Sequence, residues 1–402
     1  MIHAPSDQMV IGPYVVTTNG TWRVFEQLLT DRLGGMAVHL TDPDNLVYLV
    51  SMDGPLYEAN VHTMEVTKIA DLVTELGIDK AGGEQPHFKA AHSLNGLLYV
   101  ATNTFEPQDF NKSATKGNPY SGGGRLASWN GNNATAWTIL ERTAFVEITG
   151  RENFGRVTYA VGWDAASAIL KVLDPAVGHW QTFRLPKASH AYDHLWQTEW
   201  PRIREVETER YLMDVHGQFY ELSPLGWGGA SWGLRPVSQH LRMVPDFCAF
   251  RGMLVLGGNQ VSSIFDNNLV TGQAQSGAYF GKTDDLWSFG KPKGWGGPWR
   301  CPLTVQGSVA SDPYLMTGFD HKVMHLRVDN ITAPLTFSIE VDFTGIAAGN
   351  LGEPWSTLHV FDKITAPTYV PYVFAEGFSA HWVRIVATGQ GAATVTAYFH
   401  YT

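Results

Sequence analysis

Histidine, arginine and tyrosine side chains in polar segments of this chain could together move protons beside a bound acid. His87 and His194 suit proton abstraction because the ordinary pKa of imidazole lies near neutrality, and Tyr192 can donate a proton. Arginine pairs with carboxylates through two parallel hydrogen bonds, which assigns Arg125 and Arg202 to an anionic substrate. These residue types predict an elimination at a uronate, in which the carboxylate is neutralised, the C5 proton is removed and the departing oxygen is protonated.

Further residues of the same polar and aromatic segments are expected to bind substrate. They are His190, His216, Trp200 and Asp246, beside the two arginines. His190 and His194 have the i, i+4 spacing that suits zinc on a helix, but the segment has no helical pattern and offers no third ligand. We therefore expect no metal ligand here, and the elimination needs no cofactor. Structural histidines, held by hydrogen bonds, remain the alternative.

Four carboxylates could instead support a second kind of chemistry, the hydrolysis of a glycosidic bond. Asp193, Glu199, Asp214 and Asp246 could supply the pair of acids that a glycoside hydrolase uses, although a sequence does not give their separation. A non-catalytic propeller that binds glycans or proteins is the third hypothesis, because a fold does not fix a function. The motifs of serine hydrolases, phosphate-binding loops, zinc proteases and dinucleotide-binding folds are missing from the sequence.

The elements that would position these residues repeat along the chain. An apolar strand followed by a second strand recurs at intervals of about 40 to 60 residues, which indicates a β-propeller, an all-β fold whose blades are four-stranded sheets. The pairs are 46–50 with 56–58, 97–100 with 126–129, 157–161 with 169–171, 211–213 with 218–221, and 253–256 with 263–265. Helical periodicity is scarce, with one short helix expected at 70–76.

Proline marks the start of three innermost strands. Pro86, Pro201 and Pro245 each precede a polar residue and then an apolar one, and proline is tolerated at the first residue of a strand. In an up-and-down blade, the start of strand one, the loop from strand two to three and the end of strand four lie on one face. This alternation predicts that His87, Arg202, Asp246 and the loop at His216 gather at the mouth of the channel.

The propeller is expected to span residues 1–300 and to have seven blades of about 41 residues each, with six blades as the alternative. A loop rich in Gly, Pro and Trp at 290–298 precedes a change of pattern. Strands at 336–343, 357–361, 381–388 and 394–401, the first with strict alternation of apolar residues, predict a β-sandwich-like domain over 301–402.

Composition excludes several classes of protein. The chain has 402 residues and a formal net charge of −10, so binding to nucleic acid is not expected. No apolar run is long enough for a membrane helix, and two cysteines are too few for a disulfide scaffold.

We expect a monomer whose partner is an oligo- or polysaccharide. The N-terminal residues do not resemble an export signal, so a secreted or periplasmic location is expected only if such a signal has been removed.

Three segments resemble a known family. They are Phe183–Arg204, which contains SHAYDHLWQTEWPRIR, Asp284–Trp299, which contains DDLWSFGKPKGWGGPW, and Gly377–Arg384, which reads GFSAHWVR. Together they resemble the seven-bladed β-propeller polysaccharide lyases of the L-rhamnose-α-1,4-D-glucuronate lyase type, which act on arabinogalactans such as gum arabic. The resemblance implies a lyase with a small C-terminal β domain that uses histidine for proton transfer and arginine for the carboxylate. It also implies a structural calcium ion in the channel.

Overall fold

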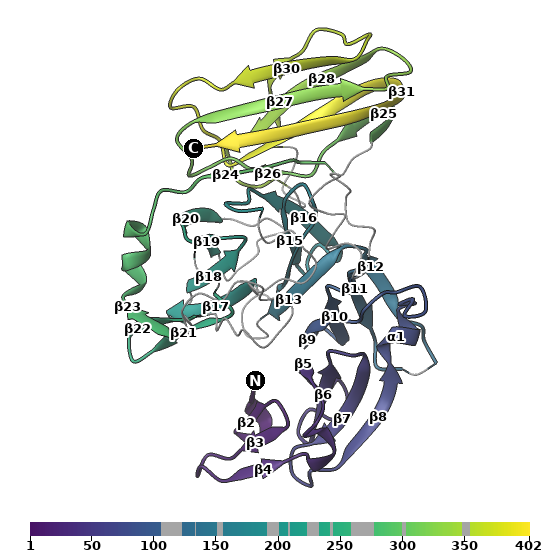
Figure 1. Cartoon of the computed structure of the whole chain (residues 1–402), viewed down its shortest axis with the longest axis vertical. Coiled ribbons are helices and arrows are strands. Elements are labelled where there is room, and N and C mark those ends of the chain that lie inside the picture. The colour runs from purple at the N-terminus through teal and green to yellow at the C-terminus, as the bar shows by residue number, and fades with distance from the viewer. Residues whose placement is uncertain are drawn as a thin grey trace. The chain divides into compact units, whose positions relative to one another are not determined.

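In the computed structural model, the regular secondary structure of the described residues consists mainly of β-strands (Figure 1). It describes residues 1–105, 123–132, 134–150, 156–190, 201–207, 210–222, 233–241, 244–258, 277–299, 303–347 and 354–402. The chain divides into two compact units, and their described parts lie within Met1–Gly162 and Trp163–Thr402. Among the described residues, no helix is long and apolar enough to cross a lipid bilayer.

Consecutive strands form antiparallel four-stranded sheets, as in the blades of a β-propeller. The first unit holds β1 (Ile2–His3), β2 (Gln8–Ile11), β3 (Tyr14–Val16) and β4 (Trp22–Val24); β5 (Leu33–Val38), β6 (Leu46–Ser51), β7 (Pro55–Asn60) and β8 (Val66–Asp71); and β9 (Phe88–Leu94), β10 (Leu97–Thr102), β11 (Arg125–Trp129) and β12 (Thr138–Glu141). The recurring apolar strands expected at 46–50 and 97–100 are β6 and β10, and each is the second strand of its blade.

Two more blades follow along the chain. One holds β13 (Ala144–Gly150), β14 (Thr158–Trp163), β15 (Ala168–Leu173) and β16 (Trp180–Leu185), and the boundary between the units falls near the end of β14. The other holds β17 (Arg202–Glu207), β18 (Arg210–Val215), β19 (Gln218–Leu222) and β20 (Arg235–Gln239). A three-stranded sheet of β21 (Phe247–Phe250), β22 (Met253–Gly257) and β23 (Ala278–Gly281) comes next.

The described residues thus form a β-propeller arrangement with five four-stranded blades, and the expectation of seven is wrong. The error lies in the assumed blade length. The first strands at Phe88 and Ala144 are 56 residues apart, whereas seven blades would require about 41 residues each. The helix expected at 70–76 is the single turn α1 (Leu72–Glu75), whose N-terminus is capped by the Asp71 carboxylate.

The C-terminal strands form two layers joined by one long strand. They are β24 (Gly294–Gly296), β25 (Leu303–Ala310), β26 (Tyr314–Leu315), β27 (Lys322–Asp329), β28 (Leu335–Asp342), β29 (Ser356–Val360), β30 (Thr368–Val373) and β31 (Trp382–Tyr401). The first part of β31 pairs with β25 and β28, and its last residues pair with β27 and β24. The two strands expected at 381–388 and 394–401 are therefore one continuous strand.

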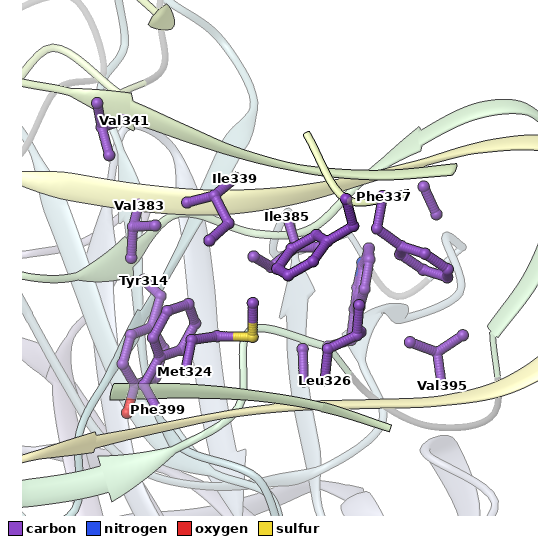
Figure 2. Close-up of a cluster of buried hydrophobic side chains, with 14 of the residues drawn as sticks. Tyr314, Met324, Leu326, Phe337, Ile339, Val341, Val383, Ile385, Val395 and Phe399 are labelled. Carbon is purple, nitrogen blue, oxygen red and sulfur yellow. The ribbon is translucent and has the colours of Figure 1, made fainter. Parts of the chain in front are cut away.

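Alternating apolar residues fill the space between the layers. Figure 2 shows Ile339 of β28 and Ile385 of β31 on one side of this core, and Met324, Leu326 and Phe399 on the other. Each of these five side chains is buried. Because successive residues of a strand point to opposite faces, the residues next to Met324, Leu326 and Phe399 on β27 and the last part of β31 point away from this core.

A buried ionic cluster ties β16 to this C-terminal part within the second unit. The guanidinium of Arg184 donates to Asp164 at 2.8 Å, to Ser167 at 2.7 Å and to Asp312 at 2.7 Å. The backbone of Arg184 also pairs in parallel with Tyr314. Burial alone would raise the pKa of Asp164, but the nearby positive charges of Arg184 and Lys187 hold it below its usual value.

Candidate active site

A tight turn between β18 and β19 organises the candidate site of the second unit. Its two central residues, His216 and Gly217, have φ of 51° and 78°, the left-handed pair that defines a type I′ hairpin. The carbonyl of His216 accepts a hydrogen bond from the backbone N–H of Ser189 at 3.0 Å, and that of Gly217 accepts one from His240 at 2.8 Å. The turn thus fixes the chain after β16 and the end of β20 at one place.

His240 and Asp214 form a buried pair beside this turn. Nε2 of His240 lies 2.9 Å from Oδ1 of Asp214, and the two side chains are 5% and 0% exposed. The ring of Phe219 packs against the imidazole with centroids 4.7 Å apart. Burial raises the pKa of the Asp214 carboxyl, and the adjacent imidazole opposes that shift only in part. A carboxylate held in this way fixes the orientation of an imidazole and stabilises its protonated form.

His240 lines a pocket of about 710 Å³. This volume lies within the range of small-molecule sites, and the mixture of aromatic and aliphatic walls with a few polar groups is typical of them. The described residues around it are Ala188, Ser189, Phe219, Gln239, His240, Leu241, Val244, Leu256, Tyr279 and Phe289. The hydroxyl of Tyr279 donates to Asp285 at 3.3 Å, and burial together with this carboxylate raises the pKa of the phenol.

Two arginines converge on Asp246 at the same blade. Arg202 lies directly opposite Asp214 in the β17–β18 register, so their side chains share one face of the sheet. Nε of Arg202 is 3.7 Å from Oδ2 of Asp246, and the guanidinium of Arg204 donates to the same oxygen at 2.9 Å. The Arg202 side chain is 8% exposed, whereas that of Asp246 is 54% exposed. Arg202 is thus a buried cation whose carboxylate partner faces solvent.

Three of the predicted binding residues therefore lie at this blade. Arg202 starts its first strand, His216 forms the turn between its second and third strands, and Asp246 pairs with Arg202. His216 is fully buried, with its ring 5.5 Å from that of Trp163. His190 lies elsewhere in the second unit. Its ring stacks on Trp295 at 5.2 Å, and its Nε2 is 3.5 Å from the hydroxyl of Tyr398.

His87 lies in the first unit and is almost completely buried. Its carbonyl accepts a hydrogen bond from the backbone of Asn103, and its ring packs edge-on against Phe105 at 6.0 Å. Burial, followed by the positive charges of Lys89 and Arg32, lowers the pKa of His87 to about 2. An imidazole with so low a pKa is a weak base, and its burial also restricts access to a polymer, so both observations disfavour His87 as the general base.

Arg125 of the first unit is engaged in internal contacts. Its guanidinium donates to the carbonyls of Gly123 and Gly77, the latter at 3.0 Å, and lies 3.4 Å from the carboxylate of Glu84. The side chain is 5% exposed. These contacts hold together the loops around β11. The predicted residues Tyr192, His194 and Trp200 lie outside the residues that the structure describes.

The described part of the chain contains no cluster of His, Cys, Asp and Glu side chains that would suit a metal ion. No group of three or more His, Cys, Asp or Glu side chains there could hold one. The described residues thus offer no cluster of three carboxylates for the calcium ion that the resemblance implies.

Sequence reasoning missed His240, although a signal was present. His240 follows β20, the fourth strand of its blade, and the end of a fourth strand lies on the same face as the start of the first. The rule that pointed to Arg202 therefore applies equally to His240. Asp214 was considered as a hydrolase carboxylate, but its pairing with a histidine 26 residues away depends on tertiary structure.

Comparisons with known proteins give only distant structural likenesses. No family model matches the chain, and no curated protein is significantly similar to it. The extracellular domain of a putative hybrid two-component system from B. thetaiotaomicron is 11% identical with a TM-score of 0.40, covering 69% of this chain and 32% of that one. The chain thus spans about a third of that protein's length. A luciferin-regenerating enzyme is 10% identical with a TM-score of 0.36, covering 67% and 87%.

Proposed function

We propose that the protein is a carbohydrate-active lyase that cleaves a glycosidic bond to a uronate by β-elimination. The observation that carries the proposal is the buried His240–Asp214 pair at the wall of a pocket of about 710 Å³. A histidine oriented by a carboxylate is a common general base, and removal of the C5 proton of a uronate is the step that needs one. His240 takes over the role that the sequence predicted for His87 and His194.

The proposed reaction balances with one base and one acid. The imidazole of His240 accepts the C5 proton, the electron pair of that C–H bond forms the C4–C5 double bond, and the bond from C4 to the departing oxygen breaks. That oxygen leaves with its electron pair and takes up a proton. Tyr192 remains the predicted donor. Asp214 stabilises the imidazolium that forms, because its carboxylate lies 2.9 Å from the ring.

Arg202 is the group that we assign to the substrate carboxylate. The C5 proton is acidified only when the adjacent carboxylate is neutralised, and a guanidinium does this best in bidentate geometry. Arg202 lies across the strand pair from Asp214 and has a partly exposed carboxylate, that of Asp246, against its Nε at 3.7 Å. In the proposed complex the uronate carboxylate competes with Asp246 for this cation.

Burial disfavours the hydrolase alternative at this site. A glycoside hydrolase needs two carboxyl groups that both reach the scissile bond. Asp214 is fully buried and hydrogen-bonded to His240, whereas Asp246 is half-exposed and paired with two arginines. Asp214 therefore acts on the imidazole and does not reach a sugar.

The products distinguish the three hypotheses. The protein is incubated with a rhamnose-capped, glucuronate-containing arabinogalactan, and we expect released sugar together with the ultraviolet absorbance of an unsaturated uronate. Release of reducing sugar without that absorbance would establish hydrolysis. Retention of the glycan without either signal would establish a binding protein, and both results would overturn the proposal.

A further inference from the structure

Six ring-bearing side chains form a continuous strip on the outer surface of the C-terminal strands. This aromatic strip consists of His190, Trp295, His325, Tyr369, Tyr398 and His400. On β27 and β31 the neighbours of these residues, among them Met324, Leu326 and Phe399, point into the core (Figure 2). Strand alternation therefore places the strip on the opposite, outward face.

Strand register brings the rings into one row. His325 of β27 lies opposite Tyr398 of β31, and His400 lies opposite Trp295 of β24. The centroid of Trp295 is 5.2 Å from that of His190 and 6.3 Å from that of His400.

The row continues to the edge strand β30. The centroid of His325 is 5.1 Å from that of His400 and 6.0 Å from that of Tyr369. Each ring thus contacts the next across four strands.

Hydrogen bonds hold both ends of the strip. Nδ1 of His325 lies 2.8 Å from the hydroxyl of Tyr369. At the other end, the backbone of Trp295 exchanges two hydrogen bonds of 3.0 Å with Lys187, which precedes His190. The rings are therefore arranged before any ligand binds, which lowers the entropic cost of binding.

The strip is accessible and contains no Asp, Glu, Lys or Arg side chain. Tyr369 is 55% exposed and His400 is also exposed. Burial, and then the neighbouring His325 and His190, lower the pKa of His400. Arg327 lies on the same face of β27 as His325 and pairs with Asp329 at 2.7 Å, so the two charges cancel. Such a surface does not favour a polyanion, because binding of a polyanion is driven by clustered Lys and Arg side chains.

We propose that the aromatic strip is a second glycan-binding site, which holds an extended, uncharged stretch of polysaccharide. Ring faces and edges offer apolar contact to the C–H groups of sugars, while imidazole nitrogens and phenol hydroxyls exchange hydrogen bonds with sugar hydroxyls. The neutrality of the strip matches a neutral chain. The site needs neither His240 nor Arg202, so it is independent of the proposed elimination.

Carboxyl-reduced arabinogalactan tests this site separately from the lyase activity, because reduction converts every uronate into a neutral sugar. The full chain is run by affinity electrophoresis in gels that contain this polymer. We expect retardation of the wild type, and at least about tenfold weaker binding for the double variant His325→Ala with Tyr369→Ala. Trp287→Ala is the matched control, since Trp287 is 49% exposed and lies outside the strip.

The outcomes are distinguishable. A wild type that the reduced polymer does not retard, or a double variant that is retarded as strongly as Trp287→Ala, would overturn the proposal. Retardation by native but not by reduced arabinogalactan would also overturn it. A second double variant, His325→Gln with Tyr369→Phe, retains most of the packing, and we expect it to bind more weakly than the wild type while unfolding at the same temperature.

Discussion

Nε2 of His240 lies 2.9 Å from Oδ1 of Asp214, a carboxylate with no exposed surface, at the wall of a pocket of about 710 Å³. A carboxylate is costly to bury unless it is paired. Its pairing with a histidine that borders a pocket is typical of a residue that moves protons, because the carboxylate both orients the ring and compensates its charge.

Replacement of Asp214 by Asn tests this pairing. The amide keeps the shape of the side chain but not its charge, so we expect the rate of elimination to fall by about 10²- to 10⁴-fold.

Burial raises the folded-state pKa of Asp214, so its contribution to stability is present below about pH 4 and is lost as the pH rises through the folded pKa. Relative to wild type, the variant should therefore gain stability between pH 4 and 7, measured by urea unfolding.

Arg202→Gln tests the assignment of the substrate carboxylate. Loss of a charge-assisted hydrogen bond costs about 1.5–3 kcal/mol, so we expect kcat/KM on a glucuronate glycan to fall by roughly 10- to 100-fold. Arg204→Gln is the matched control, because Arg204 contacts the same carboxylate of Asp246 from a more exposed position. If kcat/KM fell equally in the Arg202→Gln and Arg204→Gln variants, the loss would come from the ion pairs with Asp246, and the assignment of Arg202 to the substrate carboxylate would be wrong.

The Arg184 cluster should dominate the stability of the second unit. Arg184→Met would leave the buried carboxylate of Asp164 without its main partner, which costs about 3–5 kcal/mol. The lowered pKa of Asp164 adds stability above about pH 4 that is lost as the pH falls, so the variant should also be less sensitive to acid. Urea unfolding at pH 7 and at low pH checks both effects. Further substitution of Asp164 by Asn should restore part of the loss.

His87 should contribute to acid sensitivity. Its folded pKa of about 2 lies far below the ordinary value, so the unfolded chain binds a proton there that the folded chain does not. The stability it contributes is present above about pH 6.5 and declines as the pH falls below that value. His87→Gln should therefore narrow the difference in unfolding free energy between pH 7 and pH 5. An unchanged difference would show that His87 is protonated in the folded protein.

Much of the fold could be predicted from local patterns. The repeated apolar strand pairs and the prolines that start strands identify second, third and first strands of blades, because alternation and turn chemistry act over a few residues. The strand expected at 263–265 lies outside the described residues. The number of blades could not be derived in this way. It depends on the length of each blade, which varies along the chain: the first strands at Phe88 and Ala144 are 56 residues apart.

The candidate site was predictable only where topology alone brings residues together. Arg202 and the turn at His216 follow from the up-and-down order of a blade. The engagement of Arg125 by Glu84, and that of His190 by Trp295 and Tyr398, depends on packing between segments far apart in sequence. Residue type suggested binding at these positions, but the structure shows side chains with internal partners.

Chemical rescue of a His240→Ala variant tests the central claim most directly. The ultraviolet absorbance of the unsaturated uronate is followed during cleavage of a glucuronate-containing glycan, with and without added imidazole. We predict that the variant loses at least about 10²-fold in rate and that imidazole restores part of it, whereas an Asn variant of the exposed His62 retains the wild-type rate. A His240→Ala variant that forms the unsaturated product as fast as the wild type would contradict the account.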